Sequence, residues 1–124
     1  MIIGTGIDIV ETERISRAII RSNHFVNRFF STNEQLYFQE RNNRYEVIAG
    51  NFAAKEAFSK ALGTGIRNFA LKDIEVLRDS LGKPYMNLYN EAQHIVEKIG
   101  ATRIHISISH CKNYAVAHVI LERE

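Results

Sequence analysis

The sequence predicts a single α+β domain built on a mainly antiparallel sheet with a long central helix. Three observations lead to this prediction. Segments rich in β-branched residues lie at both ends of the chain, a stretch rich in alanine, lysine and glutamate lies in the middle, and two short strand-like segments are joined by a turn. With 124 residues the chain can bury one core, so we expect one domain over residues 1–124.

The composition is that of a folded protein, with 45% hydrophobic and 24% charged residues. The net charge is only +2, a small basic excess that does not indicate a nucleic-acid partner. No apolar run approaches the roughly 18–20 residues that span a bilayer, and the first residues lack the pattern of a signal peptide. We therefore expect a cytoplasmic protein with no membrane partner.

The first strand is predicted over residues 2–10, where isoleucine and valine dominate. Gly4 and Gly6 allow either a bulge or a close approach by another backbone. Asp8 is unusual because it stands between two isoleucines. Its carboxylate fits a strand with one wet face, and it equally fits a partner cation or a metal ion.

A helix is predicted over residues 12–22, with an apolar side and a stripe of arginines at positions 14, 17 and 21. Such a stripe is often only a solvated face, but guanidinium groups also bind carboxylates and phosphates on an acidic partner. The aromatic segment 25–30 is expected to form a short helical turn on the core. Thr32 and Gln35 fit a capping box that opens a helix to Arg41.

The long helix is predicted over residues 45–62, and it ends in a loop that begins with Gly63. Gly50 lies inside this helix and suggests that another group approaches closely there. Glu56 and Lys60 are one turn apart, and their spacing alone fits a solvated ion pair of about 0.2–0.5 kcal/mol.

Two short strands, 74–78 and 85–88, are predicted to form a hairpin, with Pro84 at a position where a strand tolerates proline. Asn90 can cap a helix that runs to Ile99. Residues 104–109 then alternate isoleucine with histidine or serine, so one face is apolar and the other polar. The last strand is predicted over residues 114–121.

Three segments together resemble one family. They are Gly-Ile-Asp-Ile-Val-Glu at 6–11, Phe-Ala-Ala-Lys-Glu-Ala-Phe-Ser-Lys-Ala-Leu-Gly-Thr-Gly at 52–65, and His-Ile-Ser-Ile-Ser-His at 105–110. The chain resembles the holo-acyl-carrier-protein synthases, the short, single-repeat branch of the phosphopantetheinyl transferases. The likeness covers nearly the whole chain, and the middle segment is the most specific.

The resemblance implies an enzyme that transfers the phosphopantetheine arm of coenzyme A to a serine hydroxyl of acyl carrier protein. It implies dependence on magnesium, release of adenosine 3′,5′-bisphosphate, and a role in fatty acid biosynthesis. It also implies a homotrimer with active sites between neighbouring subunits.

Carried over by position, Asp8 and Glu56 look like the catalytic carboxylates that bind Mg²⁺. The chemistry agrees, because Mg²⁺ prefers oxygen and is often held by one or two carboxylates together with substrate phosphate and water. Lys60 would contact the coenzyme, as a catalytic point charge on a phosphate. Either Glu56 or a metal-bound water would accept the serine proton, and the sequence does not choose between them.

The resemblance also assigns residues to coenzyme binding, some of them across the subunit boundary. A helix C-cap explains the loop glycines equally well, and a lone strand histidine is more often structural. The implied coenzyme-binding residues are Lys60, Gly63, Thr64, Gly65, Gly82, Pro84, His105 and Ser107.

The sequence departs from the family at Asn51, where the family frequently has arginine. The cation that would meet a coenzyme phosphate is then missing at that position, and Arg44 or Lys83 could replace it. The family docks the acidic carrier protein on a basic helix, which here implies the partner-binding residues Arg14, Arg17, Arg21 and Arg28.

A binding module is the competing interpretation, either a basic α+β domain that recognises RNA or a catalytically silent trimer that binds coenzyme A. The arginine stripe gives the RNA interpretation some support. The sequence carries no stacking-aromatic signature of an RNA-recognition motif, and its basic excess is small.

Overall fold

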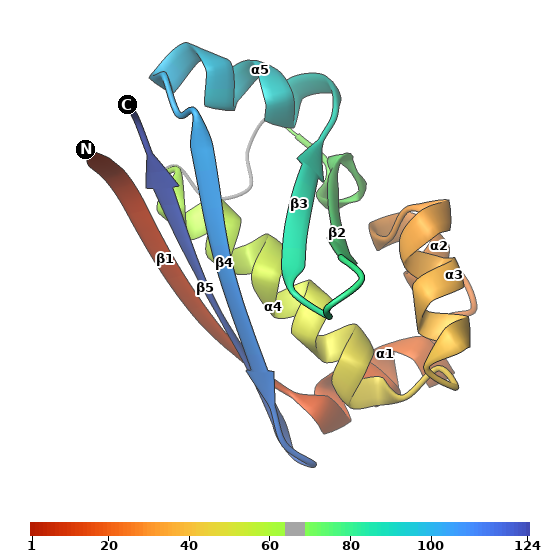
Figure 1. Cartoon of the computed structure of the whole chain (residues 1–124). Helices are drawn as coiled ribbons and strands as arrows, with labels where there is room; N and C mark the ends of the chain where they lie inside the picture. The colour runs from red at the N-terminus through yellow and green to blue at the C-terminus, as the bar shows by residue number, and fades with distance from the viewer. Residues whose placement is uncertain (64–68) are drawn as a thin grey trace.

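The computed structural model describes residues 1–63 and 69–124 (Figure 1). Among the helices in these ranges, none has both the length and the apolar character needed to cross a membrane. The elements follow in the order β1 (Ile2–Glu11), α1 (Thr12–Arg21), α2 (Phe25–Phe29), α3 (Thr32–Glu40), α4 (Tyr45–Ala61), the short 3-10 helix η1 (Leu71–Asp73), β2 (Ile74–Arg78), β3 (Pro84–Leu88), α5 (Asn90–Ile99), β4 (Arg103–His110) and β5 (Tyr114–Glu122).

The sheet brings the two ends of the chain together. β5 lies between β1 and β4 in a three-stranded sheet, and both of its pairings are antiparallel. β2 and β3 form a separate antiparallel hairpin, which lies beside β4 on the side away from β1 (Figure 1). The predicted α+β fold with antiparallel pairing and a long central helix is confirmed, with the described strands divided between two sheets.

Helix α4 packs against one face of the three-stranded sheet, and glycines on β1 allow it to come unusually close (Figure 1). A Cβ atom at Gly4 would lie 2.1 Å from the Ala61 carbonyl oxygen, and one at Gly6 would lie 2.0 Å from the Ala57 carbonyl oxygen. Both distances are far shorter than any real Cβ contact. Of the two alternatives for these glycines, the close approach is found at both, and the register of β1 also shifts between Ile2 and Gly4.

Strand alternation decides which side chains face α4. Asp8 shares the inner face of β1 with the two glycines, whereas Ile7 and Ile9 point outward with 60% and 65% of their surface exposed. On β4 the isoleucines pack on the core, as predicted. His105 and Ser107 consequently lie on the outer face of the sheet.

Two predicted helix starts need correction. The cap of α3 is Ser31 and not Thr32: the Ser31 hydroxyl accepts from the Glu34 N–H at 3.2 Å, and the Glu34 carboxylate accepts from the Ser31 N–H at 3.1 Å. Asn90 begins α5 but does not cap it, because its side chain donates to Asp73 Oδ1 at 2.9 Å. At α3 the two neighbours, Ser31 and Thr32, have similar capping ability. At α5 the contact with Asp73 draws the Asn90 side chain away, and Tyr89 takes the cap position without a side-chain hydrogen bond.

Candidate functional site

The seam between β1 and α4 brings together the predicted catalytic side chains. Asp8 projects from β1 toward the helix, where Lys60 Nζ lies 2.9 Å from Asp8 Oδ1 and 3.1 Å from the Ile7 carbonyl oxygen. Among the described residues the ion pair of Lys60 is with Asp8, so the solvated Glu56–Lys60 pair that spacing alone suggested is not what forms. Residues 52 positions apart in the chain are thus in direct contact.

Glu56 lies one helical turn before Lys60, and the charged groups of this seam change the pKa of its carboxyl group. Burial raises the pKa of the Glu56 carboxyl group, and the negative charge of Asp8 raises it further. Lys60 and Arg14 act in the opposite direction. The negative charge of Asp8 therefore acts on the Glu56 carboxylate across the seam.

The donor set of this seam fits Mg²⁺. In residues 1–63 and 69–124, no group of three or more histidine, cysteine, aspartate or glutamate side chains gathers to hold a metal. Two carboxylates are nevertheless a usual protein contribution for Mg²⁺, which completes its octahedron with water and substrate phosphate. A cation between Asp8 and Glu56 would also relieve the repulsion that raises the pKa of Glu56.

The raised pKa of Glu56 has a consequence for stability. The folded protein holds this proton more tightly than the unfolded chain, so the free energy of unfolding falls as pH rises from the unfolded pKa to the folded one. We expect Glu56→Gln, measured in a chelator, to unfold at higher urea concentration than the wild type at pH 7. The advantage should disappear below about pH 4. An equal advantage at both pH values would contradict this assignment.

His105 and Ser107 do not join this seam within one protomer. They lie on the outer face of the sheet, opposite to Asp8, and His105 Nε2 lies 2.9 Å from Glu122 Oε1. The pairing with His105 lowers the pKa of the Glu122 carboxyl group.

The turn of the β2–β3 hairpin carries the next predicted residues. Gly82 has a φ of +87°, which favours glycine, and Asp79 Oδ1 accepts from the Leu81 and Lys83 N–H groups, both at 2.9 Å. Sequence reasoning missed Asp79, although an aspartate three residues before a glycine is a recognisable turn signal.

Residues of this turn line cavities in the structure. One of about 550 Å³ is lined by Lys83, Pro84 and His105, so it unites two of the predicted coenzyme-binding residues. The other, of about 310 Å³, is lined by Gly82 and Arg44 with further basic groups. Both candidate replacements for the missing cation thus border a cavity.

Gly63 ends α4 with a φ of +79°, and its N–H donates to the Lys60 carbonyl oxygen at 3.0 Å. The helix C-cap interpretation is therefore confirmed for this glycine. Thr64 and Gly65 lie outside the described residues.

The predicted arginine stripe is exposed along α1. Arg17 is partly neutralised, because its Nη2 lies 2.8 Å from Glu13 Oε1. Arg28 lies on α2 with its guanidinium group 5.2 Å from the centre of the Phe29 ring. The structure thus presents these arginines to solvent, as a docking face requires.

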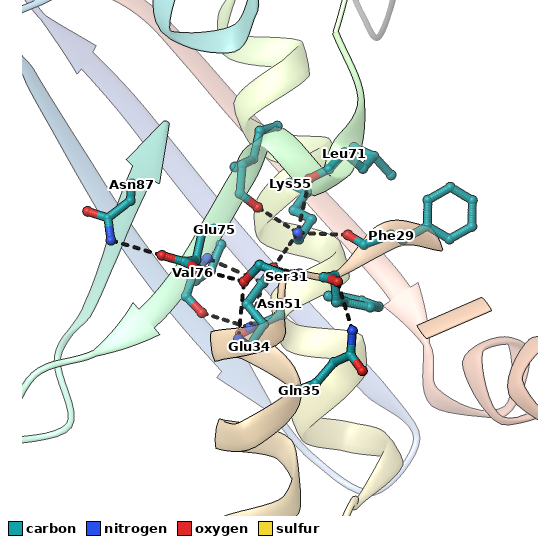
Figure 2. Close-up of polar contacts among 12 residues, drawn as sticks. Phe29, Ser31, Glu34, Gln35, Asn51, Lys55, Leu71, Glu75, Val76 and Asn87 are labelled. Carbon is teal, nitrogen blue, oxygen red and sulfur yellow. Dashed lines mark hydrogen bonds and ion pairs between the residues drawn. The ribbon is translucent and has the colours of Figure 1, made fainter. Parts of the chain in front are cut away.

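Position 51 does not face a ligand. Asn51 is fully buried, and its amide donates to Glu34 Oε2 at 3.1 Å and to the Val76 carbonyl oxygen at 2.9 Å (Figure 2). The position where the family frequently has arginine is therefore an interior position in this chain, and its side chain is hydrogen-bonded within the protein. Sequence reasoning also missed the neighbouring Lys55 and Glu34, both entirely buried.

The chain is similar to characterised families over nearly its full length. Residues 4–119 match the family described as the 4′-phosphopantetheinyl transferase superfamily. A holo-acyl-carrier-protein synthase from Alkaliphilus oremlandii is 57% identical over 120 residues, covering 97% of this chain and 98% of the relative.

Solved structures agree with this match. The holo-acyl-carrier-protein synthase from Neisseria meningitidis superposes with a TM-score of 0.92 at 35% identity, covering 99% of this chain and 100% of that one. The enzyme from Bacillus anthracis, in complex with CoA (3′,5′-ADP), gives a TM-score of 0.83 at 39% identity, covering 100% and 99%. This chain therefore belongs to the 4′-phosphopantetheinyl transferase superfamily, among the holo-acyl-carrier-protein synthases.

Proposed function

We propose that this chain transfers the 4′-phosphopantetheine arm of coenzyme A to a serine hydroxyl of apo acyl carrier protein, and that the reaction depends on Mg²⁺. The meeting of Asp8, Glu56 and Lys60 at the β1–α4 seam carries the proposal. The product is holo carrier protein, which would serve fatty acid biosynthesis in the cytoplasm, and the leaving group is adenosine 3′,5′-bisphosphate.

Each residue of the seam has a distinct part in the reaction. Asp8 and Glu56 would hold Mg²⁺, which when bound neutralises charge on the pyrophosphate. Lys60 would leave Asp8 to donate to a phosphate oxygen as a point charge. The proton of the attacking serine passes to Glu56, directly or through a water molecule, as the new phosphorus–oxygen bond forms and the bond to adenosine bisphosphate breaks.

The coenzyme nucleotide would lie against the β2–β3 turn. The cavities that this turn lines include Gly82 and Pro84 and the cations Lys83 and Arg44. A phosphate on the ribose would be recognised by these cations, in place of an arginine at position 51.

The outer face of the three-stranded sheet supports a homotrimer. It exposes Ile7 and Ile9 on β1 and the polar His105 and Ser107 on β4, with β5 between them. A neighbouring subunit would bury the isoleucines and receive the two polar side chains at its own seam. Active sites would then lie between subunits, with Gly63 to Gly65 close to the coenzyme arm.

Sedimentation tests this assembly. We expect the wild type to sediment as a trimer and Ile9→Lys as a monomer that has lost transfer, because a buried lysine would be unpaired. Leu36→Lys is the matched control, since Leu36 is 51% exposed on α3 and away from the sheet. An active wild-type monomer would eliminate the trimer.

The arginine stripe would dock the acidic carrier protein. We expect Arg21→Glu to raise KM for the carrier about tenfold at low salt with little change in kcat, and the effect should shrink as salt is added. Lys98→Glu on α5 is the control for a change of charge alone. A rise in KM that does not depend on salt concentration would argue against docking of the carrier protein at this stripe.

The direct test of the function is the mass of purified apo carrier protein after incubation with coenzyme A and the enzyme. We expect a mass increase of one phosphopantetheine arm in Mg²⁺ and none in a chelator. Binding of coenzyme A without this increase would support the silent binding module instead.

A further inference from the structure

Lys55 is a lysine enclosed entirely by protein, with none of its surface exposed. Its ammonium group donates to Glu34 Oε1 at 2.7 Å, to the Phe29 carbonyl oxygen at 2.9 Å and to the Leu71 carbonyl oxygen at 3.0 Å, and it also donates to the carbonyl oxygen of Ile74 (Figure 2). One side chain of α4 thus holds the end of α2, helix α3 and both ends of η1.

Glu34 completes the cluster from the other side. Its carboxylate accepts from Lys55, from the Ser31 N–H at 3.1 Å, from Asn51 at 3.1 Å and from the Val76 N–H at 3.3 Å. Asn51 lies one turn before Lys55 on α4, so two successive turns of the helix are tied to α3 and β2. We name Glu34, Asn51 and Lys55 the anchor cluster.

Stability alone does not explain the anchor cluster. Removing two charges from water costs about as much free energy as their attraction returns. A protein with apolar residues of equal size at these positions is often equally stable. Such a cluster does fix the position of α4 relative to α3 and β2, because each hydrogen bond has a required direction.

The opposite side of α4 lies on β1, where the ion pair with Asp8 comes from Lys60, a flexible side chain that is 56% exposed. There the helix backbone lies directly on Gly4 and Gly6, which offer no side chain to interlock with the helix. Glu56 follows Lys55 about 100° around the helix axis, so the rotation that the anchor cluster sets decides whether Glu56 points toward Asp8. A displacement of about 1 Å at a reacting group can cost about a hundredfold in rate.

We propose that the anchor cluster is a positioning device for Glu56, and that it sets the affinity of the β1–α4 seam for a divalent ion. The inference rests on the proposed function for its catalytic meaning. Glu34, Asn51 and Lys55 are positioning residues, since they act through Glu56 and do not touch the substrate.

The test uses the paired variant Glu34→Gln/Lys55→Met in the full-length protein. It removes both charges together, so no uncompensated charge stays buried. Glutamine keeps the length of Glu34, and methionine is one atom shorter than lysine. We expect Mn²⁺ affinity, measured by electron paramagnetic resonance, to fall about tenfold or more, as for other losses of support behind a metal ligand. The Mg²⁺ concentration for half-maximal transfer should rise by a similar factor, with KM for coenzyme A unchanged.

Two controls separate positioning from loss of stability. Val96→Ala truncates a buried residue of α5, so it should lower the unfolding midpoint and leave Mn²⁺ affinity unchanged. Arg103→Met/Glu124→Gln removes an exposed ion pair of 2.9 Å and should change neither quantity.

Wild-type Mn²⁺ affinity in the folded paired variant would overturn the proposal. If the paired variant does not fold, Asn51→Ala decides, because it removes one tie of the anchor cluster and leaves the Lys55–Glu34 ion pair in place. Unchanged Mn²⁺ affinity in that variant would overturn the proposal equally. Absence of transfer by the wild type would refute the proposed function, while the Mn²⁺ measurement would still decide the role of the anchor cluster.

Discussion

Asp8→Asn and Glu56→Gln should each lower the rate of phosphopantetheine transfer by at least about a hundredfold while leaving a folded protein. The expected decrease in rate equals that seen when one group that stabilises charge in a transition state is removed. Each amide keeps the shape of its carboxylate and removes the negative charge that would hold Mg²⁺. The rate of mass increase of the carrier protein, at saturating coenzyme A, is the measurement.

Glu97→Gln is the matched control, because Glu97 is an exposed carboxylate on α5. We expect the control to keep the wild-type rate. Should either Asp8→Asn or Glu56→Gln keep more than about a tenth of that rate, the corresponding carboxylate would not be a metal ligand.

Gly6→Ala should destabilise the fold by about 3 kcal/mol or more. The added Cβ would lie 2.0 Å from the Ala57 carbonyl oxygen and 2.7 Å from the Ala61 backbone nitrogen, so the backbone of α4 would have to move away from β1. That movement would also separate Glu56 from Asp8, and transfer should fall with stability. Urea unfolding at fixed protein concentration measures the effect.

Gly50→Ala adds the same methyl group on α4 itself, where it faces Ile108 of β4. There the nearest atom is the side-chain Cγ2 of Ile108 at 3.0 Å, which can shift, and alanine favours helix by about 1 kcal/mol over glycine. We expect the free energy of unfolding of Gly50→Ala to be close to that of the wild type. Equal destabilisation by Gly6→Ala and Gly50→Ala would contradict the close packing of α4 on β1.

Much of the fold could be predicted from local patterns. The alternation of isoleucine with polar residues over 104–109 predicted the faces of β4 correctly. The glycines of β1 left a bulge or a close backbone approach open, and α4 makes that close approach. The prediction was wrong where two adjacent residues had similar local preference, as at the cap of α3, because the choice depended on the contact of Glu34 with Lys55.

The candidate site was predictable where a residue was out of place in its own element. Asp8 stands among isoleucines on a strand, and its charge called for a partner that the structure supplies in Lys60. The buried charge of Lys55 was not predictable in this way, since its partners come from segments 16 to 26 residues away along the chain. Only the spacing of Asn51, Lys55 and Ser59, four residues apart in a largely apolar helix, could have signalled it.

Binding of Mn²⁺ tests most directly whether Asp8 and Glu56 share one divalent ion. Titration followed by electron paramagnetic resonance, with coenzyme A present, should give one bound ion per protomer for the wild type. Asp8→Asn and Glu56→Gln should each weaken that binding by at least about tenfold. Wild-type affinity in either variant would contradict a metal site formed by these two carboxylates.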